Sequence, residues 1–167
     1  MARPVAEYRL APARVGLAIL AGSLTGAMIV TLHWLNMVVR VLGVAYLTGG
    51  GAQGIAVVFL GAFLAWLAGL ILIGGPAWWL LHRHQIRGLR AAGLAGMAAT
   101  FVAGLILAIP LPHKDGGHSE TDRRGILIEN DQLTAYGWEK AAGGALLLSF
   151  VGGAVAVVLW KVAYRRA

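Results

Sequence analysis

Four long apolar segments dominate the chain, and short polar or glycine-rich stretches separate them. Each segment is at least as long as the ~20 residues that a helix needs to cross the hydrocarbon core of a bilayer. The first three contain no Asp, Glu, Lys or Arg, and Lys161 lies at the end of the fourth, where its side chain can reach the headgroups. The segments cover residues 15–39, 55–81, 91–111 and 141–164. The pattern predicts an all-α membrane protein, a four-helix transmembrane bundle that forms one domain over residues 1–167.

The first apolar segment could also be a cleaved signal peptide, because arginines precede it and small residues occupy positions 21–23. Its apolar run continues through Val39, however, which is longer than the 7–15 apolar residues of a signal core. We therefore expect an uncleaved membrane helix.

Composition agrees with the membrane interpretation. Hydrophobic residues make up 59% of the 167 positions, charged residues only 13%, and the mean hydropathy is +0.74. A soluble domain carries about 25% charged residues. The chain has no cysteine, which excludes disulfides, thiolate metal sites, iron–sulfur clusters and cysteine nucleophiles.

A net charge of +7 is typical of proteins that bind nucleic acid. The positions of the charges along this chain, however, indicate a different origin. Residues 112–139 hold three basic and six acidic residues, whereas the rest of the chain has eleven basic residues and one acid, Glu7. Most of these basic residues flank the spans on one predicted side: Arg3, Arg9, Arg14, Arg83, Arg87, Arg90, Lys161, Arg165 and Arg166. The positive-inside rule then predicts cytoplasmic termini in a bacterial-type inner membrane, an acidic outer loop over residues 112–139, and no nucleic-acid partner.

The stretch from Gly74 to Arg90 has the composition of a membrane edge. Residues 74–76 are Gly-Gly-Pro and should bend or end the second helix, because a proline cannot donate the helical hydrogen bond. Trp78 and Trp79 suit an aromatic belt at headgroup depth. His82 and His84 are two residues apart and do not share a helical face, so we interpret them as interfacial histidines. Contact with an anionic lipid headgroup and a metal site are the alternatives.

Small residues recur every fourth position along the third span, which permits close helix approach in lipid. This predicted helix-packing ridge consists of Ala92, Gly96, Thr100, Gly104 and Ala108. The ridge is interpreted as packing within the bundle, and the alternative is that it receives a helix from another protein.

A polar stripe continues a line of small residues along the first span. At 100° per residue, Gly22 and Gly26 fall close to the same line as His33, Asn36 and Arg40. Polar side chains in hydrocarbon require partners. We expect hydrogen bonds to other helices or to the outer loop, with an outward-facing ligand or ion site and haem ligation as alternatives.

The outer loop is the one long hydrophilic stretch. Its first part, through Gly125, is expected to be irregular. Asn130 and Asp131 lie between two strand-like runs and could form a hairpin turn, although an interfacial segment leading into the fourth span is the alternative. His113, Asp115 and His118, together with Glu120 and Asp122, form a weak metal-binding pattern, and we interpret the stretch as a solvated loop with a metal site as the alternative.

The spans lack the residues that intramembrane enzymes use, and this absence narrows the functional hypotheses. No Asp or Glu lies inside a span, so the carboxylate or nucleophile–base pairs of intramembrane enzymes are not found, and no enzyme activity or cofactor is expected. The first hypothesis is a non-catalytic accessory, assembly or anchoring subunit of a larger membrane complex. Its partners would be the bilayer and other membrane proteins, contacted through the third helix and the outer loop. A small permease or channel component with a polar site at His33, Asn36 and Arg40 is the alternative, and a haem or quinone redox protein is the second alternative.

Overall fold

The computed structural model describes residues 12–43, 51–86, 88–111 and 119–164. Four helices in this part of the chain are long and apolar enough to cross a membrane. They are α1 (Pro12–Leu42), the continuous helix from Gly51 to Arg83, α5 (Leu89–Ala108) and α6 (Ala135–Ala163). The prediction of four apolar helices, typical of a multi-pass membrane protein, is confirmed.

The second span does not end at its proline. It consists of α3 (Gly51–Gly69), a π-helical turn η1 (Leu70–Gly74) and α4 (Gly75–Arg83). The N–H of Gly75 donates to the carbonyl of Leu70, five residues earlier. A π-turn widens the helix by one residue, and here it lies directly before Pro76, which has no N–H to donate. The helix therefore continues past Pro76 and ends at Arg83.

The ends of α5 and α6 follow from local chemistry. Ile109 is extended (φ −69°, ψ 121°) because Pro110 follows it, and a residue before proline avoids the helical region. α6 begins six residues before the predicted span, since the Thr134 side chain caps it by accepting a hydrogen bond from the Gly137 N–H.

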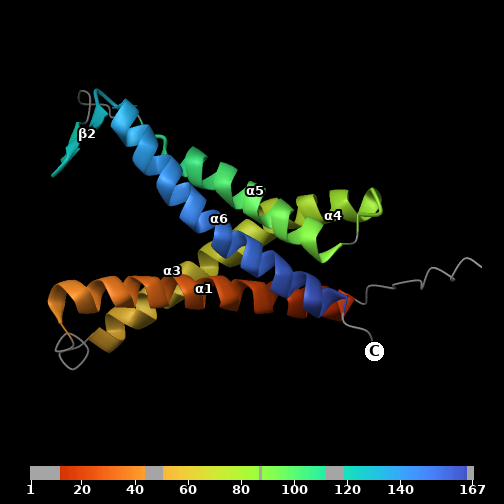
Figure 1. The fold of residues 1–167 in the computed structure, drawn as a ribbon. Helices are drawn as coiled ribbons and strands as arrows, with labels where there is room; N and C mark the ends of the chain where they lie inside the picture. The colour runs from red at the N-terminus through yellow and green to blue at the C-terminus, as the bar shows by residue number, and fades with distance from the viewer. Residues whose placement is uncertain (1–11, 44–50, 87, 112–118, 165–167) are drawn as a thin grey trace, which may run out of the picture.

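The helices are arranged in neighbouring pairs (Figure 1). α5 and α6 lie side by side, the second half of α6 packs on the first half of α1, and α3 packs on α1. In the described ranges, α3 and α5 have no pair of Cα atoms within 8 Å. The α3–α4 arm and the α5–α6 pair both pack on α1, and they meet each other through η1 and α4 but not through α3.

One end of the molecule collects the start of α1, the end of α4, the start of α5 and the end of α6 (Figure 1). The described basic residues of this end are Arg14, Arg83, Arg90 and Lys161, and we call it the basic end. A small buried cluster joins the elements there through Ala18, Ala163 and Tyr164.

Glycines set how closely α1 approaches its neighbours. A methyl group on Gly22 would lie 3.0 Å from Leu70 and 3.3 Å from Val155. One on Gly26 would lie 2.5 Å from the Trp66 ring, which packs directly on the α1 backbone. Association in lipid depends on such close packing, because apolar side chains gain nothing by leaving lipid for protein.

The predicted ridge packs on α6 through its central members. A methyl group on Gly96 would lie 2.5 Å from the Ala156 Cβ and 2.6 Å from the Gly152 carbonyl oxygen, and one on Gly104 would lie 3.1 Å from the Ala145 Cβ. Thr100 lies against Gly152, and its hydroxyl donates to the Gly96 carbonyl at 2.8 Å. These three residues of the ridge therefore pack on α6 within the chain.

A three-stranded antiparallel sheet stands at the start of α6. Its strands are β1 (Glu120–Asp122), β2 (Gly125–Glu129) and β3 (Gln132–Leu133), in the order β1-β2-β3. Asn130 and Asp131 both have positive φ (50° and 61°), the signature of the type I′ turn that suits a two-residue hairpin. The hairpin interpretation is confirmed, and the expectation of an irregular chain through Gly125 is wrong at β1.

Candidate functional site

The polar stripe of the first span remains on the surface of α1. His33, Asn36 and Arg40 are all exposed, and the Arg40 Nε donates to the Asn36 Oδ1 at 3.2 Å. An apolar crevice lies between the α3–α4 arm and the α5–α6 pair, and none of these three residues lines it. Arg14 and His33 are nineteen residues apart, about 28 Å along a helix, which is close to the ~30 Å thickness of a hydrocarbon core.

The candidate metal ligands are not brought together in the part of the chain that the structure shows. His113, Asp115 and His118 lie outside the described residues, while Glu120 and Asp122 lie on β1, where Asp122 bonds to Tyr136 and Lys140. His82 contacts Tyr164, whereas His84 is exposed at the end of α4. No group of three or more metal-ligating side chains occurs among the described residues.

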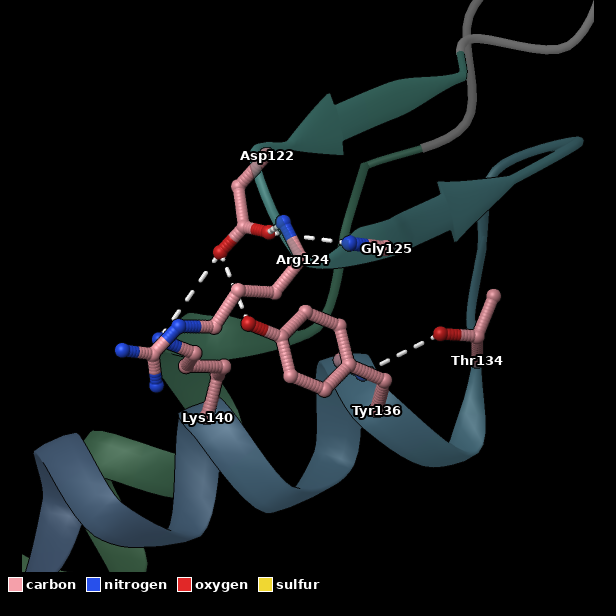
Figure 2. Close-up of polar contacts among 7 residues, drawn as sticks. Asp122, Arg124, Gly125, Thr134, Tyr136 and Lys140 are labelled. Carbon is pink, nitrogen blue, oxygen red and sulfur yellow. Dashed lines mark hydrogen bonds and ion pairs between the residues drawn. The ribbon is translucent and has the colours of Figure 1, made fainter.

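The hairpin is the most elaborate polar structure in the described chain, and Asp122 lies at its centre (Figure 2). The Oδ1 of Asp122 accepts from the backbone N–H of Arg124 at 2.6 Å and of Gly125 at 3.1 Å. These two bonds close the β1–β2 turn, as an aspartate at the first position of a turn commonly does.

The second carboxylate oxygen of Asp122 ties the hairpin to α6. The Tyr136 hydroxyl donates to Oδ2 at 2.9 Å, and the Lys140 Nζ lies 3.7 Å from the same atom. Lys140 also lies 5.5 Å above the Tyr136 ring, a cation–π distance. Asp122, Tyr136 and Lys140 therefore form one connected unit between the sheet and the first two turns of α6.

A second tie is made by Thr134 at the other side of the hairpin. Its hydroxyl contacts the carbonyls of Ile126 at 2.5 Å and Leu127 at 3.3 Å, and its backbone N–H donates to Leu127 at 3.0 Å. Gly137 lies so close to the Leu127 carbonyl that any side chain there would collide with it. The sheet is thus held directly against the start of α6.

The electrostatics of the hairpin favour an ionised Asp122. The hydrogen bond from the Arg124 backbone lowers the pKa of this carboxyl below its ordinary value of 3.8, with desolvation opposing and Tyr136, Gly125 and Lys140 adding to the lowering. Hydrogen bonds to a carboxylate stabilise the charged form. At neutral pH Asp122 is therefore ionised and presents a carboxylate to Tyr136 and Lys140.

The outward surface of this unit mixes polar and apolar groups. Ile126 on β2 and Trp138 on α6 are each 45% exposed, and all three residues of β1 are exposed. β1 lies at one edge of the sheet, so its outer backbone groups do not pair with another described strand. We call the sheet together with residues 134–140 the hairpin platform.

Trp78, His82 and Trp160 all contact Tyr164 at the basic end, and we call this cluster the aromatic clasp. The Trp78 Nε1 donates to the Tyr164 hydroxyl at 3.2 Å, and the His82 Nδ1 lies 3.2 Å from the same oxygen. The Trp78 and Tyr164 rings meet edge to face with centroids 6.1 Å apart, and Trp160 lies 5.4 Å from Tyr164. Trp78 therefore turns inward, whereas Trp79 is exposed beneath the Arg83 guanidinium, 5.3 Å from its ring.

Sequence patterns contained partial signals for these sites. Asp122 and Gly125 have the spacing of a tight turn, and Thr134 precedes an apolar run as a helix cap does. No sequence pattern indicated the role of Tyr164, because its partners His82 and Trp78 lie 82 and 86 positions earlier in the chain.

A scan against protein-family models, a search of curated proteins and a search of solved structures found no match for this chain.

Proposed function

We propose that the protein is a non-catalytic accessory subunit of a larger membrane complex, and that the hairpin platform is its docking element. In this proposal the membrane is a bacterial-type inner membrane, the basic end faces the cytoplasm and the platform faces outward. The distribution of Lys and Arg supports this orientation.

The observation that carries the proposal is the construction of the platform. A two- or three-stranded piece of this size is marginal in water by itself. Here Asp122 and Thr134 fix both sides of it to a membrane-crossing helix. Such attachment gives an exposed surface a defined position, which is what recognition of a partner requires and what a simple connecting loop does not need.

The composition of the platform surface is also suited to a contact. Ile126 lies opposite Thr121 on the same face of the sheet, next to the exposed edge of β1. An exposed apolar side chain beside free backbone groups allows both apolar burial and strand pairing by a partner. The polar stripe of α1 does not line the apolar crevice, so transport through that crevice gains no support from the stripe.

The test is purification of the tagged full chain in a mild detergent, with quantitative mass spectrometry of the proteins that accompany it. Ile126→Lys places a charge on the platform face, and Gln132→Lys, at an exposed position of β3, is the matched control. The proposal predicts that specific membrane proteins co-purify with the wild type and with Gln132→Lys but are lost from Ile126→Lys. It is wrong if the wild-type chain elutes alone, or if both lysine variants retain the same proteins.

A further inference from the structure

The hydrogen bonds of the second span are interrupted at η1. The N–H of Gly75 donates to the carbonyl of Leu70 rather than to that of Ile71, four residues before it. The next N–H within reach of the Ile71 carbonyl would be that of residue 76, which is a proline and has none. The helix therefore lacks a regular backbone hydrogen bond at Ile71, and sharp bends of helices occur at such places.

Close packing does not account for the glycine at position 75. A methyl group there would meet only the Leu70 carbonyl oxygen, at an ordinary distance of 3.6 Å. On Gly96 of α5, by contrast, a methyl group would lie 2.5 Å from the Ala156 Cβ. What glycine contributes at position 75 is backbone freedom, which costs up to ~1 kcal/mol of helix stability relative to alanine. The extra freedom lies beside the missing hydrogen bond.

The two halves of the second span are anchored to different helices. On the α3 side, the Trp66 ring packs directly on Gly26 of α1, and α3 has no Cα atom within 8 Å of one in α5 or α6. On the α4 side, Trp78 and His82 both bond to the Tyr164 hydroxyl at the end of α6. α4 approaches α5 within 8 Å between Cα atoms but does not approach α1. η1 is therefore the joint between a half held by α1 and a half held by α5 and Tyr164.

The joint coincides with a contact between three elements. Leu70 is the first residue of η1, and a methyl group on Gly22 of α1 would lie 3.0 Å from its side chain. The same methyl group would lie 3.3 Å from Val155 of α6. A bend at η1 keeps Leu70 at this contact, whereas the separation of α3 from α5 changes with distance from the joint.

The apolar crevice between α3 and α5 has room for such a change. Small side chains form much of both walls: Ala62 and Ala65 on α3, and Ala95, Ala99 and Ala103 on α5. Small residues let helix backbones approach closely in lipid. The two walls are therefore suited to direct contact as well as to the separation that the structure shows.

We propose that η1 is a hinge, and that bending there changes the angle between α3 and α4 so that the crevice closes and opens. The structure is the open form, and in the closed form α3 packs on α5. The hinge is separate from the hairpin platform, so either proposal can fail without the other.

The experiment measures distances between pairs of spin labels by double electron–electron resonance, in the full chain reconstituted into bilayer discs. The chain has no cysteine, so labels attach only at introduced positions. Val57→Cys on α3 and Ile106→Cys on α5 report across the crevice, and both positions are exposed. Leu94→Cys on α5 and Leu147→Cys on α6, also exposed, form the reference pair within the α5–α6 pair.

The expected spread follows from the length of α3. Val57 is thirteen residues before Leu70, about 20 Å along the helix, so a change of bend of about 20° moves it by about 7 Å. In the wild type, the distances between positions 57 and 106 should therefore spread over about 7 Å more than those of the reference pair.

Gly75→Ala combined with Pro76→Ala removes the glycine and supplies the missing N–H, so the spread should narrow to that of the reference pair. Pro76→Ala alone supplies only the N–H and should narrow it partly. Gly61→Ala, where nothing lies within 4 Å of a methyl group, is the matched control on α3 and should leave the spread unchanged. Circular dichroism confirms that each variant retains its helices. The proposal is overturned if the wild-type spread is no wider than that of the reference pair, if neither hinge variant narrows it, or if Gly61→Ala narrows it equally.

Discussion

Gly152 of α6 lies against Thr100 of α5 so closely that a methyl group on the glycine would collide with the threonine hydroxyl. Gly96 lies one turn away on α5, and its carbonyl accepts the hydrogen bond from that hydroxyl. The α5–α6 contact thus depends on a backbone approach that no other residue at position 152 allows.

Gly152→Ala should therefore destabilise the α5–α6 pair. Separating the helices to admit one methyl group has the cost of overpacking, about 1–3 kcal/mol. Gly144→Ala is the control, because nothing lies within 4 Å of a methyl group there and alanine favours a helix by up to ~1 kcal/mol over glycine. The measurement is the unfolding free energy in detergent with increasing denaturant. Equal stability of the two variants would mean that the contact is not as close as described.

Tyr164→Phe should loosen the aromatic clasp without removing its ring contacts. It deletes the hydroxyl shared by Trp78 and His82, and hydrogen bonds of membrane proteins contribute about 0.6 kcal/mol each on average. We expect a loss of about 1 kcal/mol in unfolding free energy, together with a change in the fluorescence of Trp78. Trp79→Phe, at an exposed position, should have no comparable effect on stability. Unchanged stability of Tyr164→Phe would show that the shared hydroxyl does not hold α4 to α6.

The hairpin platform should depend on pH through Asp122. Its pKa is lower in the folded hairpin than in an unfolded chain, chiefly because the Arg124 N–H donates to the carboxylate. The stabilising contribution is therefore complete above the unfolded pKa of about 3.9 and is lost as the pH falls through the lower, folded value.

Nuclear magnetic resonance of the Arg124 and Gly125 amides measures this dependence. Their resonances should shift with a midpoint below the ordinary aspartate value, and Asp122→Asn should abolish that transition. A midpoint at or above about 3.9 would contradict the hydrogen-bonded arrangement.

Thr31 provides a prediction of the opposite sign. Its side chain on α1 is buried, and its hydroxyl oxygen has no hydrogen-bond partner among the described residues. Valine has the same shape without the buried polar group, whose desolvation costs about 1–3 kcal/mol. Thr31→Val should leave the thermal midpoint in detergent unchanged or raise it, while Ser23→Ala, which removes a bonded hydroxyl, should not raise it. A lower midpoint for Thr31→Val than for Ser23→Ala would be inconsistent with an unpartnered hydroxyl.

The sequence predicted the helices well because lipid imposes one strong requirement. In lipid, a long apolar run has to form a helix, because only a helix pairs all backbone N–H and C=O groups within one segment. The four spans could therefore be predicted from the apolar pattern alone. The turn at Asn130 and Asp131 could also be predicted, because asparagine and aspartate tolerate the positive φ that a two-residue hairpin turn needs.

The arrangement of the helices was less predictable, because small residues permit close approach without specifying the partner. The ridge residues Gly96 and Gly104 pack on α6, but the equally small Ala62 and Ala65 of α3 line a crevice instead. What separates the two cases is the position of Trp66 on Gly26, a contact between residues forty positions apart. Strand β1 was missed for a related reason: three exposed polar residues have no strand pattern until Asp122 closes the turn.

The most direct test of the account is the membrane topology, since the hairpin platform and the basic end have to lie on opposite sides. The chain has no cysteine, so single cysteines can be introduced at Arg123 in the β1–β2 turn and at Lys161 in the last turn of α6. An impermeant thiol reagent applied to intact cells should label Arg123→Cys at once, and Lys161→Cys only after the membrane is permeabilised. Labelling of both positions from the same side, or recovery of the chain in solution without detergent, would contradict the account.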